Sequence, residues 1–76
     1  MVDQLGISPR QAHVKKTIEL FIQENGYSPT YKELAEIIGT PWTNIGRMIN
    51  ILHERGHLLK IHGLQRSIRV IKDNDY

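Results

Sequence analysis

The sequence contains no cysteine among its 76 residues, which excludes a disulfide framework and any zinc site built on cysteines. It also contains no run close to the roughly 20 apolar residues that a transmembrane helix needs. Its N-terminus lacks the basic and then apolar pattern of a secretory signal peptide. The length corresponds to one small domain. We therefore expect a single cytoplasmic domain without a membrane partner.

Net charge is small, +2 at neutral pH, but it is unevenly distributed. Acidic and basic residues cancel in residues 1–25 and again in residues 26–56. The excess lies in residues 57–76, whose charged members are Lys60, Arg66, Arg69, Lys72, Asp73 and Asp75. A local basic element on a small domain is typical of nucleic-acid binders. An ordinary solvated pair of strands would carry the same charge, so charge alone does not separate these interpretations.

Strong start and stop signals predict a first helix within residues 7–26. Ser8 is a good N-cap, and Pro9 stands at the first helical position, where its missing N–H costs nothing. Gln11 completes a capping box with Ser8, and Gly26 follows as a stop. The apolar residues that recur at helical spacing, and that we expect to form one stripe, are Val14, Ile18, Phe21 and Ile22.

A second, shorter helix is predicted between Thr30 and Gly39. Pro29 disfavours helical backbone at the residue before it. Thr30 and Glu33 form a second capping box, and Gly39 ends the helix after little more than two turns. The residues expected to face inward are Leu34, Ile37 and Ile38.

A third helix is predicted from Pro41 to about Arg55, with Thr40 or Thr43 as its cap and Gly56 as its stop. Its expected buried arc consists of Ile45, Met48, Ile49 and Leu52. Trp42 falls near the core side of the helix start, so we expect it to pack rather than to contact a ligand.

Beyond the third helix the apolar pattern changes from helical to alternating. Residues 57–62 and 67–72 are predicted strands, and residues 63–66 are the predicted hairpin turn between them. Residues 26–28 are a candidate for a short additional strand at the edge of this hairpin.

The order of these elements indicates a fold. A short helix joined to a second helix by a glycine-containing turn is the helix-turn-helix pattern, and a basic hairpin after it corresponds to a wing. We therefore expect an α+β winged helix-turn-helix, with three helices followed by a two-stranded β-hairpin wing. It would form a single domain over residues 1–76, with its core in residues 8–72.

Four short motifs in this order resemble a known family. They are RQ at 10–11, NGYSPT at 25–30, ELA at 33–35 and RSI at 66–68. Over roughly residues 8–71 the chain resembles the N-terminal DNA-binding domain of LexA-type repressors, with GYSPT-x-x-ELA as the most specific part. The resemblance implies sequence-specific binding of double-stranded DNA and regulation of transcription, with repression as the favoured interpretation.

The sequence departs from the family pattern in two respects. The turn after Gly39 is shorter by about one residue and contains Pro41 and Trp42, which leaves the recognition register and the operator sequence open. LexA-type repressors also continue into a peptidase domain with a serine–lysine self-cleavage pair, for which a chain ending at Tyr76 has no room. The resemblance therefore implies DNA binding without self-cleavage, either in a stand-alone protein of a phage or other mobile element or in a fragment.

The outward face of the third helix supplies the candidates for base contacts. A recognition helix meets base edges with its N-terminal part; arginine suits guanine O6 and N7, and asparagine suits adenine N6 and N7. The candidates on this face are Thr43, Asn44, Gly46, Arg47 and Asn50. Gly46 has no side chain, so the backbone could approach the groove closely. On an arbitrary helix, plain solvation of these residues would be the better interpretation; the predicted turn, the wing and the resemblance favour groove contact.

Two further groups are candidates for DNA contact. The free N–H groups at the start of the second helix favour an anion. The candidates for contact with the DNA backbone, which include two residues near the start of the first helix, are Ser28, Thr30, Tyr31, Lys32, Arg10 and Lys15. Wings reach a minor groove or lie on phosphates, and the wing candidates are Lys60, Gln65, Arg66 and Arg69. Thr30 is also expected to cap its helix, and Arg66 is expected in part to brace the wing.

The four histidines suggest no catalytic or metal site. His53 and His57 have a metal-compatible spacing, but Gly56 is expected to end the helix between them and no cysteine or nearby carboxylate completes a ligand set. Ordinary exposed histidines are the favoured interpretation. No nucleophile–base constellation or pair of carboxylates suggests an enzyme, and no cofactor is expected.

The expected partner is a double-stranded DNA operator, bound as a homodimer that assembles weakly or on the DNA itself. Two alternatives remain at this point. One is a protein-interaction winged helix that binds another repressor or a polymerase subunit, which would depend on apolar surface such as Trp42, Ile51 or Leu64. The other is a replication or recombination accessory factor that binds DNA without a promoter.

Overall fold

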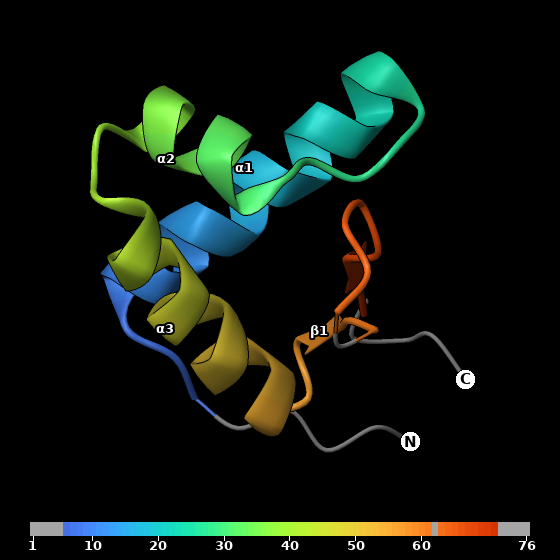
Figure 1. Cartoon of the computed structure of the whole chain (residues 1–76). Coiled ribbons are helices and arrows are strands. Elements are labelled where there is room, and N and C mark those ends of the chain that lie inside the picture. The colour runs from blue at the N-terminus through green and yellow to red at the C-terminus, as the bar shows by residue number, and fades with distance from the viewer. Residues whose placement is uncertain (1–5, 62, 72–76) are drawn as a thin grey trace.

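The computed structural model describes residues 6–61 and 63–71, and it has the expected winged helix-turn-helix fold (Figure 1). Its elements in chain order are α1 (Pro9–Asn25), α2 (Tyr31–Ile38), α3 (Trp42–Glu54), β1 (Leu58–Leu59) and β2 (Arg69–Val70). The strands are antiparallel, with Leu58 opposite Val70 and Leu59 opposite Arg69. In Figure 1 the C-terminal end of α3 leads into β1, and the wing rises beside the segment that enters α2.

Both predicted capping boxes are confirmed. The Ser8 hydroxyl accepts from the Gln11 N–H at 3.1 Å while the Gln11 side chain accepts from the Ser8 N–H at 2.9 Å. Thr30 and Glu33 repeat the arrangement at the start of α2, at 3.1 and 2.9 Å. Gly26 and Gly39, with φ of 77° and 82°, end α1 and α2 in the left-handed conformation that favours glycine.

The start of α3 differs from the prediction. Neither Thr40 nor Thr43 caps it: Pro41 is the N-cap residue, and no side chain completes the cap. The Pro41 carbonyl accepts from the N–H groups of Asn44 and Ile45 at 3.0 and 3.3 Å. The turn after Gly39 is therefore followed at once by the first backbone hydrogen bonds of α3. The start of α3 therefore leaves backbone N–H groups without a side-chain acceptor.

The core joins all three helices to the wing. Its buried hydrophobic members are Val14, Ile18, Leu34, Ile45, Met48, Ile49, Leu52, Leu58 and Ile68. The predicted buried arc of α3 is confirmed in full, whereas Phe21 and Ile22 of α1 are only half-buried.

The inward position predicted for Ile37 is wrong, because its side chain is 57% exposed. At about 100° per residue, Ile38 and Ala35 lie on one side of Leu34 around α2, and Ile37 lies on the other. Ile38 and Ala35 pack against the core. The helix therefore turns that side, and not Ile37, toward its neighbours.

The wing has a shorter ladder than predicted, with two residue pairs instead of two six-residue strands. His62 and Lys72, the last residues of those predicted strands, lie outside the described residues. The candidate strand at 26–28 does not form. In its place the Ser28 hydroxyl accepts from the Ile68 N–H at 3.0 Å, so a side chain makes the link that a strand would have made.

None of the helices within the described residues has the length and hydrophobicity needed to cross a lipid bilayer.

Candidate nucleic-acid interface

A cleft of about 850 Å³ opens between the start of α2, one face of α3 and the wing. Its lining consists of Pro29, Thr30, Tyr31, Lys32, Trp42, Gly46, Asn50, Lys60, Ile61, Gly63, Leu64, Gln65, Arg66, Ser67 and Ile68. The charged side chains in this lining are Lys32, Lys60 and Arg66, and all three are cationic. The cleft therefore favours an anionic partner with some apolar surface.

One row of α3 borders the cleft. Trp42, Gly46 and Asn50 follow one another at four-residue spacing, which places them on one side of a helix. The packing predicted for Trp42 is wrong, because its side chain is 63% exposed and lines the cleft. Trp42 begins the helix directly after Pro41, and its side chain joins the row that faces the wing.

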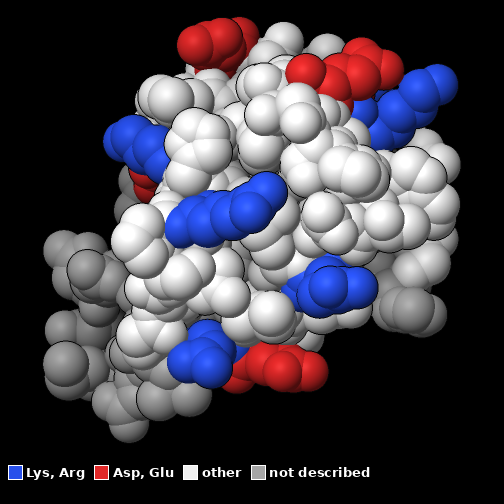
Figure 2. Space-filling model, turned by 90° about the vertical axis from the view of Figure 1, so that its left-hand side faces the viewer, with Lys and Arg blue, Asp and Glu red and all other residues white. Residues whose placement is uncertain are grey.

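The other candidates for base contact lie outside the cleft lining. Thr43 and Arg47 are exposed on α3. Asn44 is half-buried, and its amide nitrogen donates to the Thr40 hydroxyl at 3.4 Å. Figure 2 views the molecule from the side on which α3 lies in Figure 1; lysine and arginine side chains stand there amid uncharged surface, with acidic side chains toward the margins.

Gly46 faces Tyr31 of α2. A Cβ atom at Gly46 would lie 3.5 Å from the Tyr31 ring, which is ordinary van der Waals contact. The packing of α2 against α3 therefore leaves room for a Cβ at position 46 and does not require glycine there.

At the start of α2 the candidates have different surroundings. Thr30, Tyr31 and Lys32 line the cleft, with the Thr30 hydroxyl already occupied by its cap. Ser28 does not line it: its side chain is 7% exposed, donates to the Pro29 carbonyl at 3.1 Å and accepts from Ile68. The Ser28 side chain therefore has a structural role.

The candidates on α1 and β2 lie away from the cleft. Arg10 and Arg69 are exposed. Lys15 is half-buried, and its ammonium lies 3.0 Å from Nδ1 of His57. Lys15 therefore faces the protein interior rather than a surface ligand.

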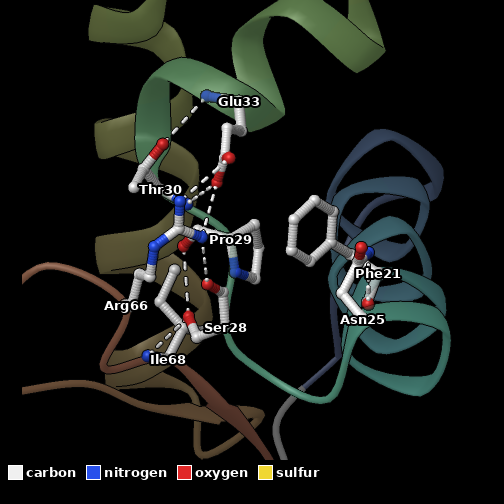
Figure 3. Close-up of polar contacts among 8 residues, drawn as sticks. All are labelled: Phe21, Asn25, Ser28, Pro29, Thr30, Glu33, Arg66 and Ile68. Atoms are coloured by element: carbon white, nitrogen blue, oxygen red, sulfur yellow. Dashed lines mark hydrogen bonds and ion pairs between the residues drawn. The ribbon is translucent and has the colours of Figure 1, made fainter.

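Arg66 connects the wing to α2 (Figure 3). Its guanidinium donates two hydrogen bonds to the Glu33 carboxylate, at 2.9 and 3.0 Å, and a third to the Ser28 carbonyl at 3.1 Å. It also lies 4.7 Å from the centre of the Tyr27 ring. The hydrogen bonds that Glu33 accepts from Arg66, together with the capping bond from the Thr30 N–H, lower the pKa of Glu33, and the same pairing raises the pKa of Arg66. The guanidinium thus braces the wing at the edge of the cleft.

Sequence reasoning did not assign the apolar part of the lining to the DNA interface; it named Trp42 and Leu64 only as surface for a protein partner, and it did not name Ile61. Ile61 and Leu64 of the wing are exposed, as is Trp42 across the cleft from them. Leu64 offered a signal, since it is an apolar residue inside a predicted turn, where polar residues are usual. Exposed apolar side chains beside cations suit the sugar faces and thymine methyls of DNA.

The surroundings of two histidines, His53 and His57, differ in part from the prediction. His57 is 7% exposed, so the interpretation as an ordinary exposed histidine is wrong for this residue. Nδ1 of His53 lies 3.1 Å from the Leu58 carbonyl oxygen. Within the part of the chain that the structure describes, no group of three histidine or acidic side chains could hold a metal ion.

Comparison with known proteins identifies relatives over most of this chain, although no family model matches it. It is 29% identical over 70 residues to the LexA repressor of Frankia alni, 32% over 66 residues to that of Oleidesulfovibrio alaskensis, and 33% over 72 residues to LexA repressor 1 of Geobacter sulfurreducens. These alignments cover 91%, 87% and 91% of this chain. The resemblance to LexA repressors is confirmed. The chain spans between 25% and 35% of the length of the LexA repressors that it matches.

Proposed function

We propose that this chain binds double-stranded DNA in a sequence-specific manner and acts as a transcriptional repressor. The observation that carries the proposal is the cleft between α3 and the wing, whose charged lining is entirely cationic. A winged helix-turn-helix places a helix in the major groove and its wing along the backbone or in the minor groove. Similarity to proteins named LexA repressors supports the same function.

In this proposal α3 contacts the bases. Thr43, Asn44, Gly46, Arg47 and Asn50 face the major groove from the N-terminal part of the helix, where base edges come within reach. The exposed Arg47 is the principal guanine-binding side chain, because its fork of donors matches O6 and N7.

The remaining candidates position the protein on the sugar–phosphate backbone. Lys32, Tyr31 and Thr30 at the start of α2 would approach one strand, together with the backbone at Ser28, and Arg10 would add a contact from α1. The wing would contribute Lys60, Gln65, Arg66 and Arg69. Two copies on adjacent half-sites, assembled on the DNA, would cover a promoter and block polymerase.

Selection of bound sequences from a random duplex pool, followed by titration of the best site at two salt concentrations, tests this function. An enriched palindrome or repeated half-site is the expected result, and its spacing would show how two copies are arranged. Salt-sensitive binding without an enriched motif would indicate an accessory DNA-binding role. Absence of binding at low salt would reject DNA as the partner and direct attention to a protein ligand for Trp42, Ile61 and Leu64.

A further inference from the structure

Lys60 crosses the cleft from the wing and contacts both helices that border it. Its ammonium donates to the Asn50 side-chain oxygen on α3 and to the Tyr31 hydroxyl on α2, the latter at 3.3 Å. It also lies 6.0 Å from the centre of the Tyr31 ring. Lys60 is half-buried, and the described lining of the cleft offers it no carboxylate as a competing partner.

This contact fixes the orientation of the Asn50 amide. A lysine ammonium only donates hydrogen bonds, so the amide must turn its oxygen toward Lys60. The amide nitrogen then points away from Lys60, and among the described residues it donates to no acceptor. Asn50 therefore presents two N–H donors toward whatever enters the cleft.

Such an amide is a poor partner for adenine, because the Lys60 ammonium beside its oxygen repels the N6 amino group that adenine would bring to the same oxygen. Bidentate binding of adenine needs the oxygen to accept from N6 while the nitrogen donates to N7. An amide whose oxygen is paired with an ammonium, and whose two N–H groups face the cleft, matches base edges rich in acceptors, which in the major groove are guanine with N7 and O6 and thymine with O4.

We propose that Lys60 is a specificity-determining residue that acts through Asn50. It holds the amide as a donor, so that Asn50 selects guanine or thymine instead of the adenine that asparagine otherwise favours. This inference rests on the proposed DNA-binding function and adds a base preference to one of its contacts. It also assigns Lys60 a role beyond that of a phosphate-binding cation.

The test compares bound-sequence selections for the wild type, Lys60→Met, Lys60→Arg and Asn50→Ala. The position read by Asn50 is the one whose preference disappears in Asn50→Ala. At that position the wild type and Lys60→Arg, which keeps a donor, should prefer guanine or thymine. Lys60→Met should shift the preference toward adenine by about tenfold, the scale of one good bidentate contact.

A double variant distinguishes an effect of Lys60 on the Asn50 amide from an effect of the Lys60 charge alone. When Asn50→Ala is already present, Lys60→Met should change no base preference and should lower affinity for all sequences alike. If Lys60→Met in the wild-type background also lowers affinity uniformly and leaves that position unchanged, Lys60 is only a phosphate contact and the inference is overturned. A wild type that prefers adenine at that position would overturn it as well.

A measurement without DNA distinguishes failure of this inference from failure of the proposed function. Lys60→Met should shift the Asn50 side-chain amide resonances in the NMR spectrum of the free protein, and Lys60→Arg should shift them less. Unchanged resonances in Lys60→Met would overturn the contact itself. Shifted resonances in a protein that selects no DNA sequence would instead reject the proposed function, and with it the assigned base preference.

Discussion

Arg66 and Glu33 form a two-point ion pair between the wing and the first turn of α2, with nitrogen–oxygen distances of 2.9 and 3.0 Å. The same carboxylate accepts from the Thr30 N–H and so completes the helix cap. Arg66 adopts a left-handed backbone with φ of 54°, which is uncommon for a residue with a side chain. One glutamate thus joins the helix start, the cleft and the wing.

Glu33→Gln should weaken DNA binding although it removes a negative charge. Glutamine still completes a capping box, so α2 should remain intact, but the paired charge that holds Arg66 is lost and the wing is less well positioned. Charge alone predicts the opposite, since removing an acidic group favours binding to phosphates. Titration of the best selected site measures the effect, with circular dichroism to verify helix content.

Glu36→Gln is the matched control for this change, because it removes the same charge from an exposed position of the same helix. It should bind DNA as well as the wild type or slightly better. Equal affinities of the two variants would show that the ion pair does not position the wing.

Low pH should weaken the ion pair between Arg66 and Glu33. The pKa of Glu33 is lowered in the folded protein, chiefly by the Arg66 hydrogen bonds, so its contribution to stability is complete above the ordinary glutamate value of about 4.3. The contribution is lost as pH falls through the lower folded pKa, where the carboxylate is protonated. Urea unfolding at several pH values should therefore show a stability difference between wild type and Glu33→Gln that is constant near neutrality. A difference that persists unchanged at the lowest pH would contradict this linkage.

The sequence was sufficient to predict the fold because its signals are local. The two capping boxes, the glycine stops of α1 and α2 and the buried arc of α3 all depend on residues close in the chain, and all are as predicted, whereas Arg55 and not Gly56 is the C-cap residue of α3. The base and backbone contacts assigned to this face remain predictions. Apart from the cap of α3 and the length of the wing strands, the errors concern residues whose surroundings come from distant elements: Ile37 is exposed because of where α1 and α3 lie, and His57 is buried beside Lys15, 42 positions away. Trp42 belongs to the same group, since the wing lies across the cleft from it.

Ser28→Ala should lower the free energy of unfolding by about 1–3 kcal/mol, because it leaves the buried N–H of Ile68 without its acceptor. Chemical denaturation measures this loss. Thr17→Ala is a suitable control, since the Thr17 hydroxyl only supplements a helix carbonyl at an exposed hydrogen bond. Similar stability of both variants would show that the Ser28 hydroxyl is not needed to dock the wing.

Arg47→Ala and Lys32→Ala should have different effects on DNA binding. Loss of Arg47 removes a base contact, so discrimination between the best site and unrelated DNA should fall by about 1–3 kcal/mol. Loss of Lys32 removes a phosphate contact, so affinity should fall alike for all sequences and the salt slope should fall by about 1. Titrations of both DNAs at several salt concentrations provide these values. Equal loss on all DNA from both changes would contradict this division of roles.

Gly46→Ala should stabilise the fold by roughly 0.4–1 kcal/mol, because alanine favours the helix and its Cβ would make ordinary contact with Tyr31 at 3.5 Å. DNA affinity should nevertheless decrease, because the added methyl group keeps α3 farther from the groove. Thermal unfolding and DNA titration test the two effects separately. A variant that binds DNA as well as the wild type would remove Gly46 from the interface.

The two-pair ladder of the wing has a consequence for how this protein could change its target. So short a ladder contributes little by itself, and side chains such as Arg66, Ser28 and Lys60 hold the hairpin against the helices. Substitutions at Ser28, or at Glu33 that pairs with Arg66, would change how the hairpin is held without replacing any residue of α3. New operators could therefore be acquired through these attachments of the wing, by small steps that leave the sequence of α3 unchanged.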